Sequence, residues 1–351
     1  MDPTVYVPRY LERLYLSSHP DLTPAARELV HADVAKNPER YATTDHAKAL
    51  ILYSRVHSKL MTSLDRMDEL SDEEFETERN KLFDRTGAEL QAICAADRLC
   101  IDAELLTILL ADTPIDPCLS DLMKLESKTR GYLSDNVDGL DLDPDHEPDA
   151  PHFWKHRVLI DGTTAAELTA SEPTLIGWLH TLEAISYLCL ASARYRAALH
   201  YSQIVMRAEG YPNRAVGTEL LAYARLEDEN AFFDLARKHP DTIDGKLEDS
   251  PWYLLGRTIL LYKTDKMKSA ARALRELVGR CDGAAYFLLN PTYMCPYLPV
   301  RPAPRESWDL SRQALWEADS IIADTPDFAV WAESVDGVAA ASEAFAQRNG
   351  F

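Results

Sequence analysis

Two histidines have the spacing most suited to binding a metal ion. His152 and His156 stand four residues apart, so on a helix they would share one face, as many zinc ligands do. The residues between them are Phe, Trp and Lys, and an HExxH motif is absent. We therefore expect an ordinary hydrogen-bonded or solvent-exposed pair and assign no metal ligand.

A second candidate for chemistry is the acidic stretch at residues 134–150, SDNVDGLDLDPDHEPDA. With Gly139 at the sixth position of a calcium loop, Ser134 would be the first ligand and Asp145 the twelfth. An EF-hand needs Asp first and a bidentate Glu last. Like-charge repulsion and two prolines instead predict a loop without a helix.

Motifs that organise catalysis are absent from the sequence. It has no G-x-x-x-x-G-K-[ST], no G-x-G-x-x-G and no G-x-S-x-G. We expect no enzyme activity and no cofactor.

Binding a partner is better supported, by aromatic and arginine side chains. The stretch at residues 286–297, YFLLNPTYMCPY, combines rigid aromatics with prolines. Its alternative role is to cap the end of a helical array. Other candidates lie on predicted helices that would line a groove, where a solvated face is the alternative. The possible partner-binding residues are Arg225, Arg257, Tyr262, Tyr293 and Tyr297.

These side chains must be positioned by helices. Apolar residues recur at spacings of three and four, which predicts an all-α protein. Helix starts are predicted at Thr23-Pro24, at the capping box Ser71–Glu74, at Thr164 with Glu167, and at Ser250-Pro251.

A repeat organises the second half of the chain. Ala197 and Ala231, each four residues before a larger apolar side chain, are 34 residues apart, the period of the tetratricopeptide repeat. Ala197, Tyr201 and Ile204 are predicted to face inward. The predicted helix pairs are 175–188 with 194–206, 216–226 with 230–238, and 252–262 with 266–278, followed by a degenerate unit after Asn290-Pro291. We expect a tetratricopeptide-like α-solenoid of stacked antiparallel helix pairs with a helical N-terminal region.

Three regions follow from this pattern. We predict an N-terminal helical region at 1–133, an acidic loop or linker at 134–150, and a tetratricopeptide-like repeat region with a C-terminal cap at 151–351. The formal net charge of −20 argues against nucleic acid and against anionic membranes, and would attract a basic partner. The N-terminus does not read as a signal peptide, so we expect a cytoplasmic protein.

Three segments resemble bacterial relatives of the suppressor-of-tumorigenicity-seven family, a helical-repeat group. They are residues 92–106, Phe153-Trp154, and the run from Ala197 through His200-Tyr201, Pro212, Gly217 and Asn290-Pro291 to Trp316. The chain departs from the family's polar run between Pro212 and Gly217, where it has Arg214-Ala215-Val216, and it has Glu219 where the family has Arg. The resemblance implies a tetratricopeptide-like fold and no reaction.

The leading hypothesis is a scaffold that binds a peptide or protein segment in the concave groove of the array. One alternative is a helical protein with a small-molecule or metal site. Another is a self-assembling structural protein, whose exposed aromatic arm at residues 6–16 would dock on a neighbouring subunit. The sequence leaves the oligomeric state open.

Overall fold

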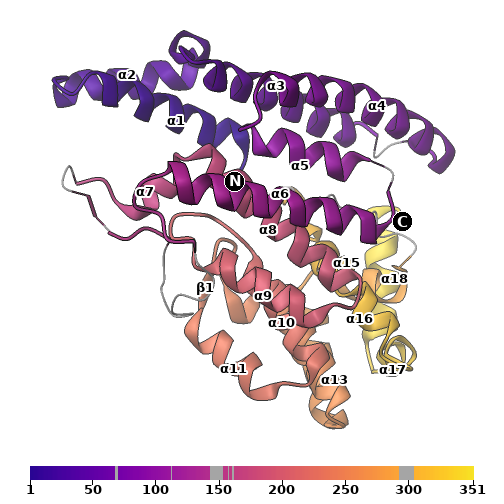
Figure 1. Ribbon diagram of the computed structural model, residues 1–351. Coiled ribbons are helices and arrows are strands. Elements are labelled where there is room, and N and C mark those ends of the chain that lie inside the picture. The colour runs from indigo at the N-terminus through magenta and orange to yellow at the C-terminus, as the bar shows by residue number, and fades with distance from the viewer. Residues whose placement is uncertain (68–69, 112, 143–152, 157, 160–161, 292–303) are drawn as a thin grey trace. The chain divides into compact units, whose positions relative to one another are not determined.

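The predicted helix starts are present in the computed structural model, which describes all residues except 68–69, 112, 143–152, 157, 160–161 and 292–303 (Figure 1). Thr23 Oγ1 accepts a hydrogen bond from the backbone N–H of Ala26 at 3.3 Å. Glu74 Oε2 accepts from the backbone N–H of Ser71 at 3.3 Å, as a capping box requires. Most of the described residues are helical and very few form strands, which confirms the all-α class.

The chain forms two compact units. Unit 1 comprises residues 1–181 and 207–211, and unit 2 comprises residues 182–206 and 212–351. The division falls inside the helix α8, Pro173–Ala191. That helix is long and apolar enough to cross a membrane, but 83% of its apolar window is buried in the protein, as in an ordinary core helix.

Unit 1 is a set of helices that pack mainly on helices near them in the sequence. Figure 1 shows α3 and α4 as long neighbours, and α1 contacts α3, α4 contacts α5, and α5 contacts α6. Its elements are α1 (Pro3–Ser18), α2 (Pro24–Lys36), η1 (Pro38–Tyr41), α3 (Asp45–Asp65), α4 (Asp72–Ala96), α5 (Ile101–Leu110), α6 (Ile115–Asn136), α7 (Ala165–Ala170) and the first part of α8.

The core of unit 1 corrects the expectation of an exposed aromatic arm. Tyr6 and Leu11 of α1 are fully buried. The apolar face of α1 is therefore covered by its own unit, which removes the motive for docking on a neighbouring subunit. Phe153 and Trp154 are also buried, and the rings of Phe153 and Trp178 meet edge to face at 5.4 Å.

The acidic segment begins later than predicted, because α6 continues to Asn136. Beyond it, Leu140 forms an antiparallel bridge with Trp154. The backbone N–H of Asp141 donates to the Phe153 carbonyl at 2.7 Å, so this part of the segment is tied to the core. The remainder of the predicted linker lies outside the described residues.

The described residues of unit 2 form the second part of α8, ten further α-helices and one 3-10 helix. The interval between α11 and α12 holds a small antiparallel hairpin with Asp241 opposite Lys246 and Thr242 opposite Gly245. The elements are α9 (Tyr195–Met206), α10 (Ala215–Leu226), α11 (Glu229–Lys238), β1 (Asp241–Thr242), β2 (Gly245–Lys246), η2 (Leu247–Asp249), α12 (Pro251–Lys263), α13 (Met267–Arg280), α14 (Ala284–Leu289), α15 (Asp309–Glu317), α16 (Asp319–Ala323), α17 (Phe328–Ser334) and α18 (Val338–Asn349).

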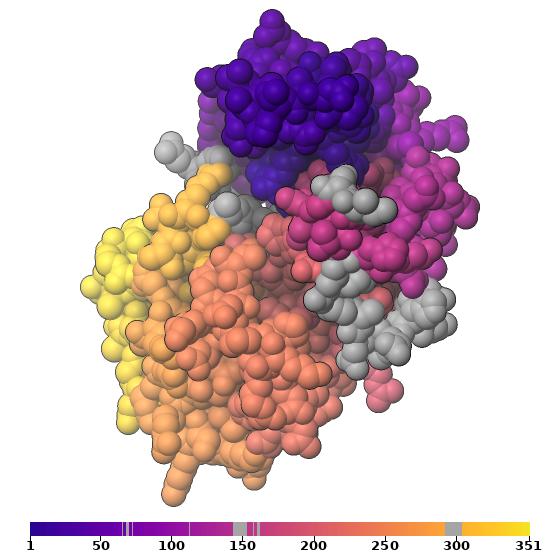
Figure 2. Space-filling view, turned by 90° about the vertical axis from the view of Figure 1, so that its left-hand side faces the viewer, coloured from indigo at the N-terminus to yellow at the C-terminus, as the bar shows by residue number. Residues whose placement is uncertain are grey.

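The helices of unit 2 pack mainly on neighbours in the chain. α10 contacts α9, α11 and α12, and α12 also contacts α13 and α15. At the contact between α10 and α12, a Cβ on Gly217 would lie 2.7 Å from the Trp252 ring. A glycine there lets the two backbones approach closely. α13 and α18 also contact each other, and both form part of the surface shown in orange and yellow in Figure 2.

The inward face of α9 differs from the prediction by one position. Ala198, Ser202 and Val205 are fully buried, whereas Ala197 and Tyr201 are half-buried. A one-residue shift turns the side-chain direction by about 100° on a helix. The 34-residue interval is retained between buried positions, because Phe232 of α11 follows Ala198 by that distance.

Candidate functional site

Two predicted groove residues, Arg225 of α10 and Tyr262 of α12, contact the turn between α16 and α17. Arg225 pairs with Asp324, with Nε 3.0 Å from Oδ2, and its guanidinium lies over the Tyr195 ring. The hydroxyl of Tyr262 donates to the Pro326 carbonyl at 3.0 Å. In this structure both side chains serve contacts within unit 2.

Arg257 is also engaged within unit 2. It forms an ion pair with Glu276 of α13, and its guanidinium lies 5.5 Å from the centre of the Tyr253 ring. The hydrogen bond from Arg257, together with its charge, holds the pKa of Glu276 below its usual value. Tyr293 and Tyr297 lie outside the described residues.

The surface formed by α8, α10 and α12 is covered by residues 316–326. The rings of Tyr187 and Trp316 stack at 4.7 Å, and Ser320 Oγ donates to the Leu190 carbonyl at 3.1 Å. Trp252 Nε1 donates to the buried carboxylate of Glu317 at 2.9 Å. These contacts fill the face on which a partner was expected.

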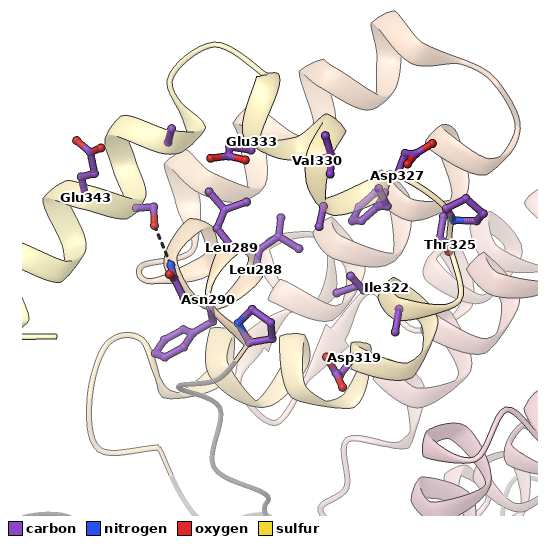
Figure 3. A pocket seen from close by; sticks show the side chains of 18 residues that line it. Leu288, Leu289, Asn290, Asp319, Ile322, Thr325, Asp327, Val330, Glu333 and Glu343 are labelled. Atoms are coloured by element: carbon purple, nitrogen blue, oxygen red, sulfur yellow. Dashed lines mark hydrogen bonds between the residues drawn. The ribbon is translucent and has the colours of Figure 1, made fainter.

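The described residues leave a hollow of about 630 Å³ open at the C-terminal end of unit 2. Figure 3 shows Leu288, Leu289 and Ile322 along its apolar floor. The ring of Phe328 is buried beneath it, whereas Val330 at its edge is 69% exposed. The wall therefore offers apolar surface that the described chain leaves uncovered.

Four carboxylates surround this floor. Asp319 belongs to α16, Asp327 precedes α17, and Glu333 and Glu343 belong to α17 and α18 (Figure 3). The described lining contains no Lys, Arg or His. Desolvation raises the pKa of Asp319, and no neighbouring cation offsets it. The electrostatics of the hollow thus favour a positively charged ligand.

A second polar arrangement is buried in unit 1. The Asp102 carboxylate of α5 accepts from the Tyr6 hydroxyl at 2.6 Å and lies 2.8 Å from His180 Nδ1. The Met1 amine lies 2.7 Å from His180 Nε2. Burial alone would raise the pKa of Asp102, but His180 and the Tyr6 hydrogen bond outweigh it and hold that pKa below its usual value.

An Asp–His pair can orient a general base in catalysis. Here both ring nitrogens of His180 have partners, and the side chain is buried. The cluster therefore acts as a hydrogen-bonded connection between α1, α5 and α8.

The metal candidates are not brought together among the residues that the structure describes. His156 is exposed, and His152 lies outside the described residues. Asp135 is still helical at the end of α6, so the proposed calcium loop does not start as a loop. Within the described part of the chain, no three His, Cys, Asp or Glu side chains are placed to hold one ion.

Sequence reasoning missed both polar features. The acids of the hollow stand at intervals of eight, six and ten residues, which match no helical period. Asp102 did carry a signal, because it is an acid inside the apolar run at residues 100–106. Such a residue is usually buried only with partners.

Glu219, which departs from the family pattern, is a further buried acid. Burial raises its pKa to about 8, although a hydrogen bond from Gln203 offsets part of the effect. No described residue gives its Oε1 a hydrogen bond.

Comparison with known proteins adds no assignment to this geometry. No family model matches the chain, and no curated protein or solved structure is detectably similar to it.

Proposed function

We propose that this protein is a helical-repeat interaction module that binds a segment of another protein and does not act by catalysis. The observation that carries the proposal is the open hollow of unit 2, where an apolar floor meets the surface. Exposed apolar surface in a concave site is typical of binding regions.

The helix order supports a repeat array. α10 packs between α9 and α12, and α12 packs on α13, as expected of consecutive helix pairs in a stack. Ser186 Oγ of α8 donates to the Ala198 carbonyl of α9 at 2.9 Å, which joins the preceding pair. The buried Ala198 and Phe232 repeat at the 34-residue interval.

Residues 316–326 cover the predicted groove on α8, α10 and α12, so we propose a different location for the binding site. Ala314, Leu315, Ala318 and Ile321 are fully buried, so α15 and α16 form part of the core of unit 2. A segment that buries so much apolar surface is costly to displace. The hollow formed by α14, α16, α17 and α18 is therefore the better site for a partner.

The shape of the hollow favours a protein segment over a small molecule. Its volume lies within the range of small-molecule pockets, about 300–1,000 Å³. Such pockets usually enclose about 70–90% of the ligand surface. Val330, Glu333 and Glu343 in the wall are exposed, so the hollow suits side chains that project from a larger partner.

Site-specific photo-crosslinking tests this proposal. A photoreactive amino acid replaces Val330 at the hollow or, as the matched control, Ile243, which is 51% exposed at the hairpin of the same unit. In lysate of the source cells, we expect a discrete protein adduct from position 330 and none from position 243. The same adducts from both positions, or none from either, would refute the proposed site.

A further inference from the structure

We infer that the partner segment is a basic amphipathic helix, whose apolar face covers the floor of the hollow and whose Lys or Arg side chains pair with the surrounding acids. This inference rests on the proposed function, since it names the chemistry of the segment bound at the same site. It combines an unfilled apolar surface with a surplus of negative charge in one place.

The apolar surface of the hollow includes the exposed side chain of Val330. Among the described residues of unit 2, it is the most exposed of the large aliphatic and aromatic side chains. It adjoins Ile322 and Leu289, which line the same hollow. The apolar face of an amphipathic helix would remove this surface from water, as in other helix-in-groove complexes.

The acids around the hollow differ from other acids of unit 2 in their ion pairs. Nearby acids such as Asp324 and Glu276 already form ion pairs with arginines. Asp319, Asp327, Glu333 and Glu343 have no ion-pair partner among the described residues. A cation arriving there would meet carboxylates that need not exchange an existing partner.

The spacing of the described acids does not suit a single metal ion as the occupant. No three of the described carboxylates, thiols or imidazoles converge closely enough to coordinate one ion. Several separate cations on one rigid scaffold match this arrangement better. Lys and Arg on one helix provide it, because residues three and four apart project from the same face.

The net charge of −20 gives the competing explanation that any basic peptide would bind. A test must therefore separate local charge from global charge. The hollow variant neutralises four acids, and the control variant neutralises four exposed acids in unit 1, so that both remove the same charge. The hollow variant is D319N/D327N/E333Q/E343Q, and the control is D21N/E28Q/E73Q/E76Q.

The probe is a fluorescein-labelled helical peptide of Leu and Lys, about 18 residues or five turns long. Fluorescence anisotropy compares it with a Leu–Glu peptide of the same pattern and with a scrambled Leu–Lys peptide. We expect only the patterned basic peptide to bind tightly at low salt. Its Kd should rise about tenfold in the hollow variant and by less than about twofold in the control.

Three outcomes would overturn the inference. They are equal weakening by both variants, equal binding of the scrambled peptide, and binding of the acidic peptide. Light scattering adds a fourth, because a dimer broken by Val330→Gln would assign the hollow to a second copy of this chain. If Val330 crosslinks a partner and the four neutralisations leave that adduct unchanged, the proposed function stands and only the basic helix is wrong.

Discussion

Two buried carboxylates, one in each unit, are stabilised in opposite protonation states. Asp102 in unit 1 has Tyr6 and His180 as partners, and its pKa lies below the usual value. Glu219 in unit 2 has no cation, and burial raises its pKa to about 8. The difference shows that partners, and not burial alone, decide whether an acid in this protein is charged at neutral pH.

The opposite shifts have opposite effects on stability. Asp102 stabilises the fold above its unfolded pKa of 3.8, and this contribution is lost as the pH falls through its lower folded value. Glu219 ionises more readily in the unfolded chain, so stability falls as the pH rises from about 4.5 to about 8.

The largest effect is expected from Asp102→Asn. The substitution removes the charge that His180 and the Tyr6 hydroxyl share, and it leaves buried polar groups poorly paired. We expect a loss of roughly 3–5 kcal/mol in the free energy of unfolding, measured with urea at pH 7. Tyr6→Phe removes one hydrogen bond and should cost only about 1–2 kcal/mol. Equal effects of the two substitutions would show that the Asp102 charge is unimportant.

Glu219→Gln should stabilise the protein, and more so at higher pH. The unfolded Glu gains about 1.4 kcal/mol per pH unit above 4.5, so the variant should exceed the wild type by about 3 kcal/mol at pH 7. At pH 5 the difference should be below about 1 kcal/mol. Urea unfolding across this range measures it. A gap that does not change with pH would mean that Glu219 is not protonated in the folded state.

Two glycines test whether the units depend equally on close helix contacts. A Cβ on Gly177 of unit 1 would lie 2.6 Å from Ile101 Cβ, much as Gly217 of unit 2 would meet Trp252. Substituting either by Ala should cost about 1–3 kcal/mol by overpacking. Gly87 is the control, since its helical site is open, and Gly87→Ala should stabilise by up to about 1 kcal/mol. Equal changes in the thermal unfolding midpoint for all three substitutions would contradict this interpretation.

The smallest effect is expected from Arg225→Ala. Its partner Asp324 is exposed, and exposed ion pairs contribute little because water screens them. We expect no resolvable change in the urea midpoint. A large loss of stability would show that the covering of α10 by the C-terminal helices depends on this pair.

Local signals in the sequence predicted much of the fold. Thr23, Ser71, Thr164 and Ser250 each begin a helix as expected, because a cap needs only residues within one turn. The predicted inward face of α9 was wrong by one residue, because the run Ala197-Ala198-Leu199 fits more than one helical register. The predicted end of α6 was also wrong. Hydrogen bonds to the carbonyls of Leu133 and Tyr132 hold its last turn, and the acidic run that follows takes no part in them.

The candidate site was less predictable. Arg225 and Tyr262 were identified as groove residues, but nothing nearby in the sequence indicates Asp324 or Pro326 as partners. The two members of the Arg225–Asp324 pair are 99 positions apart. The hollow draws on residues of four helices, and the four acids around it share no helical period.

The sequence by itself determined that this chain is helical and where many of its helices begin, and it predicted a repeat interval of 34 residues. The helical class and the helix starts follow from side chains within a few turns, and the interval follows from a period. Both kinds of signal can be read directly along the sequence. Only the tertiary structure decided which charges found partners. Asp102 is paired and Glu219 is not because pairing depends on which helices pack together, and four acids stay unpaired because no described basic side chain reaches the hollow.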